Sequence, residues 1–176
     1  MARQVKVITA AEAAALIKNG DTVTTSGFVA SAIPEALDRA VEERFLATGE
    51  PRDITYVYCG SQGNKDGRGA EHFAHEGLLK RYIAGHWATV PALQKMALEN
   101  KMEAYNVSQG ALCHLFRDIA AHRPGCFTKV GLGTFIDPRN GGGKVNDVTK
   151  EDIIELVNIK GQDYLFYPRI PPSTLL

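Results

Sequence analysis

Five short turns rich in glycine and polar residues each follow a segment with strong β-propensity. They are Ser26-Gly27-Phe28, Gly60-Ser61-Gln62-Gly63, Gly85-His86-Trp87, Ser108-Gln109-Gly110 and Gly131-Leu132-Gly133-Thr134. Glycine lets a ligand approach the backbone closely and leaves N–H groups free to donate hydrogen bonds. Simple chain reversal explains any one of these turns better than ligand binding does. Five of them together favour a binding crevice that holds a polar ligand.

Other pairs of reactive side chains give weaker signals. His72 and His75 stand three residues apart, but no third ligand is evident, so we interpret them as an exposed helix turn rather than a metal site. Cys113 precedes His114 in a predicted helix, where neighbours point roughly 100° apart, so they form no thiolate–imidazole pair. We expect Cys113 to pack in the core. No G-x-S-x-G nucleophile elbow occurs in the chain.

The elements that must position these turns alternate between strands and helices. Helices are expected at about 10–18, 34–49, 71–79, 91–99, 111–121 and from 149, and strands at about 21–25, 54–58, 81–84, 102–107, 127–130 and 164–167. This alternation predicts a single α/β domain over residues 1–176, a three-layer α/β/α arrangement with a mostly parallel sheet. Ligands bind outside the carboxyl ends of the strands in such a sheet, so all five turns are expected along one rim.

Composition excludes several classes of function. The 176 residues include 20 Lys and Arg and 20 Asp and Glu, so no basic excess is available for nucleic acid. No apolar run is long enough to cross a membrane, and the N-terminus does not resemble a signal peptide. The three cysteines are widely spaced and form no disulfide framework. These features predict a reduced, cytoplasmic protein.

Three segments resemble the family I coenzyme A transferases. The run Gly20 to Glu35, which contains Gly27-Phe28 and Ile33-Pro34, is similar to the N-terminal signature of that family, with Ser26 in place of its first glycine. The turn Ser108-Gln109-Gly110 is similar to a proline-glutamine-glycine turn, and Gly131 to Gly143 is similar to the next family block. The likeness covers nearly all of residues 5 to 170 and implies the fold shared by the CoA-transferases and the related sugar-phosphate isomerases.

The resemblance also implies a mechanism of covalent catalysis. Family members have two similar lobes, and a glutamate of the second lobe attacks the acyl-CoA thioester. In the first lobe, the Gln109 amide is implied as the donor that supports the oxyanion. The implied substrate-binding residues are those of the matching turns: Gly27, Phe28, Gly110, Gly131, Gly133, Thr134 and Phe135. Coenzyme A or acyl-CoA would be a substrate, with no metal and no permanently bound cofactor.

The glutamate motif of the second lobe, E-x-G-x-x-G, does not occur in these residues. We therefore expect an N-terminal lobe or α subunit of an acetate-, propionate- or acetoacetate-type CoA-transferase, inactive alone and completed by a second lobe or β subunit in an oligomer. Such an enzyme would act in short-chain fatty acid and ketone-body metabolism. One alternative is a non-catalytic module of the same fold that binds a metabolite or a partner. A sugar-phosphate isomerase or sensor ranks last, because no acid–base pair stands beside a phosphate cradle.

Overall fold

The computed structural model describes residues 5–170 and 172–175, and its centre is a sheet of five parallel strands. The strand order is β4-β3-β2-β1-β8, with β1 at Thr22–Thr24, β2 at Ile54–Tyr58, β3 at Leu79–Ala84, β4 at Glu103–Asn106 and β8 at Thr174–Leu175. β-Branched and aromatic residues dominate β2, whose sequence is Ile-Thr-Tyr-Val-Tyr. The parallel pairing brings the carboxyl ends of β1 to β4 to one edge.

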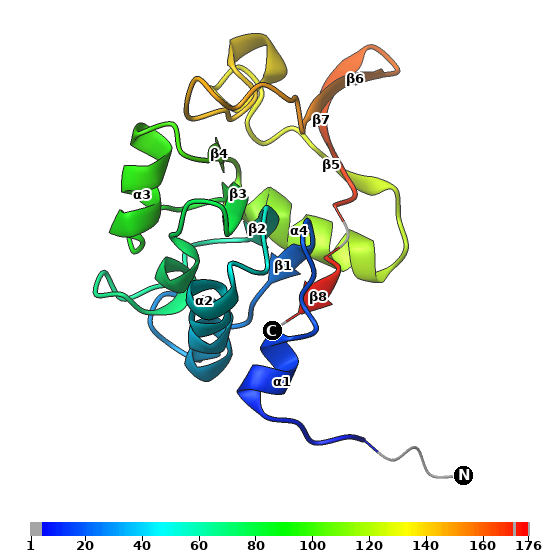
Figure 1. The fold of residues 1–176 in the computed structure, drawn as a ribbon. Coiled ribbons are helices and arrows are strands. Elements are labelled where there is room, and N and C mark those ends of the chain that lie inside the picture. The colour runs from blue at the N-terminus through cyan, green and yellow to red at the C-terminus, as the bar shows by residue number, and fades with distance from the viewer. Residues whose placement is uncertain (1–4, 171, 176) are drawn as a thin grey trace.

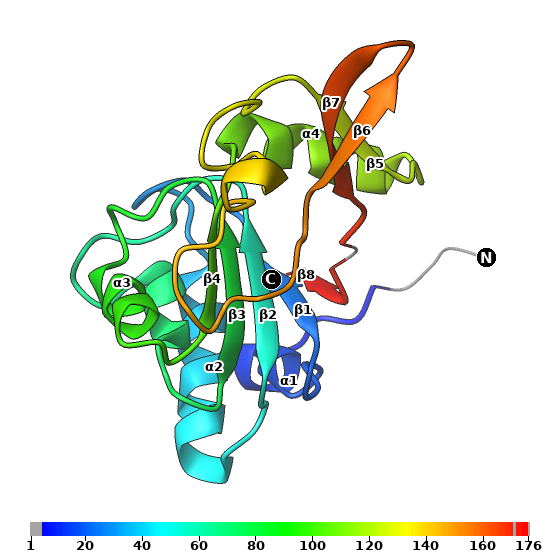
Figure 2. The same ribbon diagram turned by 90° about the horizontal axis from the view of Figure 1, so that it is seen from above.

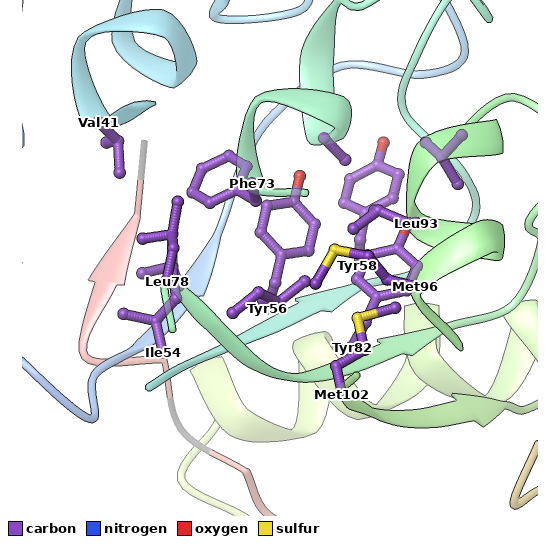
Figure 3. Packing of buried hydrophobic residues seen from close by; sticks show 14 of the residues in the cluster. Val41, Ile54, Tyr56, Tyr58, Phe73, Leu78, Tyr82, Leu93, Met96 and Met102 are labelled. Carbon is purple, nitrogen blue, oxygen red and sulfur yellow. The ribbon is translucent and has the colours of Figure 1, made fainter. Parts of the chain in front are cut away.

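Helices cover both faces of this sheet, which confirms the predicted three-layer α/β/α class (Figures 1 and 2). One face carries α1 (Ala10–Ala14), α2 (Glu35–Thr48), the 3₁₀ helix η1 (Gly69–Phe73) and α3 (Pro91–Leu98). Figure 3 shows Tyr56, Tyr82, Phe73 and Leu93 packed between these helices and the sheet. The other face carries α4 (Gln109–Ala120), whose Leu112 and Leu115 pack in a second cluster.

A second, antiparallel sheet of three strands packs against α4. Its order is β5-β7-β6, with β5 at Gly125–Thr128, β6 at Glu155–Ile159 and β7 at Gln162–Pro168. Leu165 and Tyr167 of β7 are buried in the same cluster as α4. The β6–β7 hairpin extends away from the parallel sheet in both views (Figures 1 and 2). The expectation that the strand near residue 127 joins the parallel sheet is therefore wrong.

Two predicted helices also differ from the structure. The helix expected over 71–79 is the single turn η1, because Gly77, at φ +87°, interrupts the chain before β3. The helix expected from residue 149 is absent from the described chain. The Thr149 hydroxyl instead accepts a hydrogen bond from the Ala104 N–H of β4 at 2.7 Å, which ties this segment to the sheet edge.

The start of α1 agrees with its sequence signal. Thr9 and Glu12 form the predicted capping box, in which the Glu12 N–H donates to the Thr9 hydroxyl at 3.2 Å and the Thr9 N–H donates to the Glu12 carboxylate at 2.8 Å. None of the helices in the described ranges is both long enough and apolar enough to cross a lipid bilayer.

Candidate active site

Four of the five predicted turns lie together at the carboxyl edge of the parallel sheet, because they directly follow β1, β2, β3 and β4. The fifth, Gly131 to Thr134, follows β5 of the antiparallel sheet. The expectation of five turns along one rim is therefore corrected to four.

The Gly27-Phe28 turn is a tight reversal with backbone hydrogen bonds in both directions. The Phe28 N–H donates to the Ser31 carbonyl, and the Ser31 N–H donates to the Phe28 carbonyl, both at 2.9 Å. Gly27 has φ +105°, and a Cβ there would lie 2.6 Å from the Ala32 carbonyl oxygen, so only glycine fits. The turn leaves the Phe28 ring 57% exposed at the rim.

Two buried side chains, one at the end of β2 and one shortly after it, hold this turn by hydrogen bonds to its carbonyl groups. The Gln62 amide donates to the Ser26 carbonyl, and the Tyr58 hydroxyl donates to the Gly27 carbonyl. The Gln62 side-chain oxygen in turn accepts a hydrogen bond from the Tyr56 hydroxyl at 2.7 Å. Sequence reasoning missed these supports, and their only signal is a glutamine immediately after a tyrosine-rich strand.

Gln109 is the first residue of α4, and its side chain is exposed. Its amide makes no hydrogen bond to another residue of the described chain, whereas the preceding Ser108 caps the helix by accepting from the Ala111 N–H at 3.3 Å. The Gln109 Nε2 lies 3.3 Å from the position of a Cβ built on Gly60, and the Phe28 ring lies 3.4 Å from the same position. The structure thus brings Gln109 and Phe28 together across Gly60.

The two glycines nearest Gln109 have different roles. A Cβ on Gly85 would lie 2.4 Å from the Cys59 carbonyl oxygen and 2.5 Å from the Gln109 Cα, so β3 and α4 pack backbone against backbone here. Gly110 is exposed, and nothing lies within 4 Å of a Cβ built on it. Gly110 therefore leaves the N-terminal turn of α4 open, where backbone N–H groups and the helix dipole favour negative charge.

The loop that contains the remaining predicted site residues is organised by Asp137. Its carboxylate accepts from the Gly133 N–H at 2.8 Å and from the Arg139 guanidinium at 2.7 and 2.9 Å. The Arg139 hydrogen bond, followed by the Gly133 N–H, holds the pKa of Asp137 well below its usual range. This buried carboxylate is structural, since its oxygens are occupied by its own loop.

The same loop meets the parallel sheet through Gly143, which Phe135 holds in place. The Phe135 carbonyl accepts from the Gly143 N–H at 3.0 Å, and the Gly143 carbonyl accepts from the Asn106 N–H at the end of β4 at 2.8 Å. Gly131 instead packs against Leu165 of β7, and Thr134 hydrogen-bonds the Gly131 carbonyl at 2.7 Å. The contacts of Gly131, Gly133 and Thr134 thus lie within the loop and β7 rather than against Gln109, and their part in substrate binding stays a prediction.

His72 and His75 do not form the exposed turn that was expected. His72 is buried, with its two ring nitrogens 2.9 Å from a Glu35 oxygen and 2.6 Å from a Glu42 oxygen. His75 lies 2.6 Å from the other Glu42 oxygen. Burial opposes the charge on His72, but the hydrogen bonds to Glu35 and Glu42 outweigh it and raise the pKa of this histidine. The pair joins η1 and the following turn to α2.

Comparison with known proteins decides the family. The model of the coenzyme A transferase family matches residues 7–172. The chain belongs to the coenzyme A transferase family. Within it, the chain is 41% identical over 162 residues to the caffeate CoA-transferase of Acetobacterium woodii, across 92% of this chain and 31% of that protein. It is 39% identical over 172 residues to the acetate CoA-transferase YdiF of Escherichia coli K12, across 97% of this chain and 32% of that protein.

Solved structures agree with this membership. The acyl-CoA transferase YdiF of E. coli O157:H7, determined as a thioester complex with CoA, superposes with a TM-score of 0.88 at 37% identity, over 96% of this chain and 33% of that one. This chain spans about a third of the length of the curated relatives it matches, 31% for the caffeate enzyme and 32% for YdiF.

Proposed function

We propose that this chain forms the N-terminal, α-type lobe of a short-chain acyl-CoA:carboxylate CoA-transferase and supplies its oxyanion side. The observation that carries the proposal is the Gln109 amide, exposed at the carboxyl edge of the sheet, facing Phe28 across Gly60 and free of hydrogen bonds to other described residues. An amide in that state can donate to a ligand at no cost to the fold.

In the proposed mechanism, covalent catalysis replaces one difficult transfer of CoA by a series of easier displacements. A glutamate carboxylate of the second lobe attacks the thioester carbonyl, the C–S bond breaks, and CoA leaves as its thiolate. That thiolate attacks the glutamyl carbonyl of the resulting anhydride and releases the first carboxylate, so that CoA is carried by the enzyme. The acceptor carboxylate then runs the same two displacements in reverse, leaves as the new acyl-CoA, and frees the glutamate. Negative charge develops on a carbonyl oxygen in each step. We assign the stabilisation of this charge to the Gln109 amide and to the N-terminal turn of α4.

The partners of this lobe follow from that chemistry. They are a second lobe or β subunit carrying E-x-G-x-x-G, an acyl-CoA and a short carboxylate, with no permanently bound cofactor. The named activities of two relatives, acetate and caffeate CoA transfer, support carboxylate acceptors as the substrate class. The three free cysteines are compatible with a reduced compartment such as the cytoplasm, where we place the activity.

Reconstitution tests the proposal. The chain is mixed or fused with a second lobe that contains E-x-G-x-x-G, and CoA transfer from acetyl-CoA to propionate is followed by the appearance of propionyl-CoA. We expect transfer with the pair and none with either lobe alone. A pair that assembles without transferring CoA, while this chain alone binds a metabolite, would instead support the non-catalytic module.

A further inference from the structure

Two thiols flank the contact between Gln109 and Gly60. Cys59 immediately precedes Gly60 at the end of β2, and Cys113 lies on α4, four residues after Gln109. Residues four apart project from the same face of a helix. Since the Gln109 side chain lies against Gly60, Cys113 projects toward the same end of β2 one helical turn further on.

Cys59 packs against the hydrophobic cluster that contains Leu112 and Leu115 of α4, so its side chain faces the helix that carries Cys113. Burial, followed by the nearby Cys113 thiol, raises the pKa of the Cys59 thiol to about 12. Cys59 is half-buried, whereas Cys113 is exposed, so the expectation that Cys113 packs in the core is wrong. Both are free thiols in the structure.

We propose that Cys59 and Cys113 are a modification site, at which hydrogen peroxide or an organic peroxide converts the two thiols into an intramolecular disulfide. The exposed Cys113 reacts first: its thiolate sulfur attacks a peroxide oxygen, the O–O bond breaks, and a sulfenic acid forms. The Cys59 sulfur then displaces the hydroxyl group, the S–S bond forms, and water leaves. With hydrogen peroxide, the thiols lose two electrons and two protons, and the peroxide becomes two molecules of water.

The third cysteine is not part of this site. Cys126 lies on β5, is only 5% exposed, and directs its thiol toward the Phe127 carbonyl at 4.0 Å. It therefore serves as an internal control for selectivity. The disulfide would join the residue before Gly60 to the helix turn after Gln109, and so would fix the end of β2 against the start of α4.

The test is a disulfide map of the folded protein. The protein is treated with a small excess of hydrogen peroxide, quenched in acid, alkylated in denaturant, and digested without a reductant for mass spectrometry. We expect a peptide pair linked through Cys59 and Cys113 that disappears after dithiothreitol, with Cys126 recovered in its alkylated form. Cys126→Ser should give the same linked pair, and Cys113→Ser should give none.

Two results would overturn the proposal. One is oxidation of Cys113 to its sulfinic or sulfonic acid while Cys59 stays fully alkylated, which would mean that the second thiol does not reach the first. The other is that the relative yields of the three possible disulfides are the same in the folded protein as in the protein unfolded in urea. Both are measured on the wild-type chain, so the conclusion does not depend on whether a cysteine variant folds.

Discussion

The Gln109 side-chain nitrogen lies 3.3 Å from the point where a Cβ on Gly60 would stand. The Phe28 ring lies 3.4 Å from the same point. Gly60 is therefore the spacer between a hydrogen-bond donor and an exposed aromatic ring. Any side chain at position 60 would press against both the Gln109 amide and the Phe28 ring.

Replacement of Gln109 tests its role as the oxyanion donor. In the reconstituted enzyme, we predict that Gln109→Ala lowers turnover by roughly 10- to 1000-fold, as expected for the loss of one such donor. The KM for CoA should change little, because the proposed loss falls on the transition state. Gln162→Ala, an exposed glutamine on β7, is the matched control and should leave turnover unaltered. Full turnover in a correctly folded Gln109→Ala enzyme would remove Gln109 from the site.

Gly60→Ala separates the effect on the site from the effect on the fold. The atoms nearest to the new methyl group are the end of the Gln109 side chain and the edge of the Phe28 ring, both of which can shift by a few tenths of an ångström. We predict a change in unfolding free energy below about 1 kcal/mol, together with a fall in turnover. Urea unfolding and steady-state kinetics on the same preparation measure both. A large loss of stability, or normal turnover, would contradict the proposed spacer role.

Gly85 and Gly110 are predicted to respond oppositely to alanine. At Gly85 the new Cβ meets backbone atoms at 2.4 and 2.5 Å, so β3 and α4 must separate, at a cost of roughly 1–3 kcal/mol or more. At Gly110 nothing lies within 4 Å, and alanine in a helix should stabilise the protein by about 0.5–1 kcal/mol. Urea midpoints of the two variants give the comparison. Equal midpoints would mean that the packing of α4 on β3 is looser than described.

Asp38 should make stability depend on pH. Its side chain is fully buried on α2, neither oxygen has a hydrogen-bond partner in the described chain, and burial raises its pKa from 3.8 to about 7. Between these values the folded state holds a proton that the unfolded state has released, so stability falls as the pH rises from about 4 to 7. The raised pKa of His72 acts in the same direction, since its contribution is lost as the pH rises through the folded-state value.

Asp38→Asn isolates the aspartate contribution. The variant should match the wild type near pH 4 and exceed its unfolding free energy by roughly 2–4 kcal/mol at pH 8, because one pKa unit corresponds to about 1.4 kcal/mol. Urea unfolding at several pH values measures this difference. A variant that loses stability at pH 8 would show that the ionised Asp38 carboxylate has a partner that stabilises it.

The sequence predicts the layers of the fold better than the partners of each strand. The capping box at Thr9 is a local signal, and so is the β-propensity of residues 54–58, and both elements form as expected. Residues 127–130 also favour a strand, which forms two residues earlier as β5, but its pairing with β7 depends on residues far along the chain, and no local pattern reveals it.

For the site, the sequence predicts the positions of the turns but not the contacts of the residues around them. The turns that hold Gln109 and Phe28 follow their strands directly, so their place at the rim follows from the parallel topology. The support from Gln62 was not predictable, because the Ser26 carbonyl that it binds belongs to the turn after a different strand, β1. The burial of His72 likewise depends on two glutamates of α2, which the sequence does not place near it.

The most direct test of which lobe carries the nucleophile is to locate the covalent intermediate. The chain and a second lobe carrying E-x-G-x-x-G are mixed, given one equivalent of acetyl-CoA, reduced with borohydride and mapped by mass spectrometry. We predict a reduced glutamyl residue on the second lobe alone, and neither label nor CoA transfer when this chain is treated without its partner. A label on any glutamate of this chain, with transfer in the partner's absence, would contradict the account and place the nucleophile in this lobe.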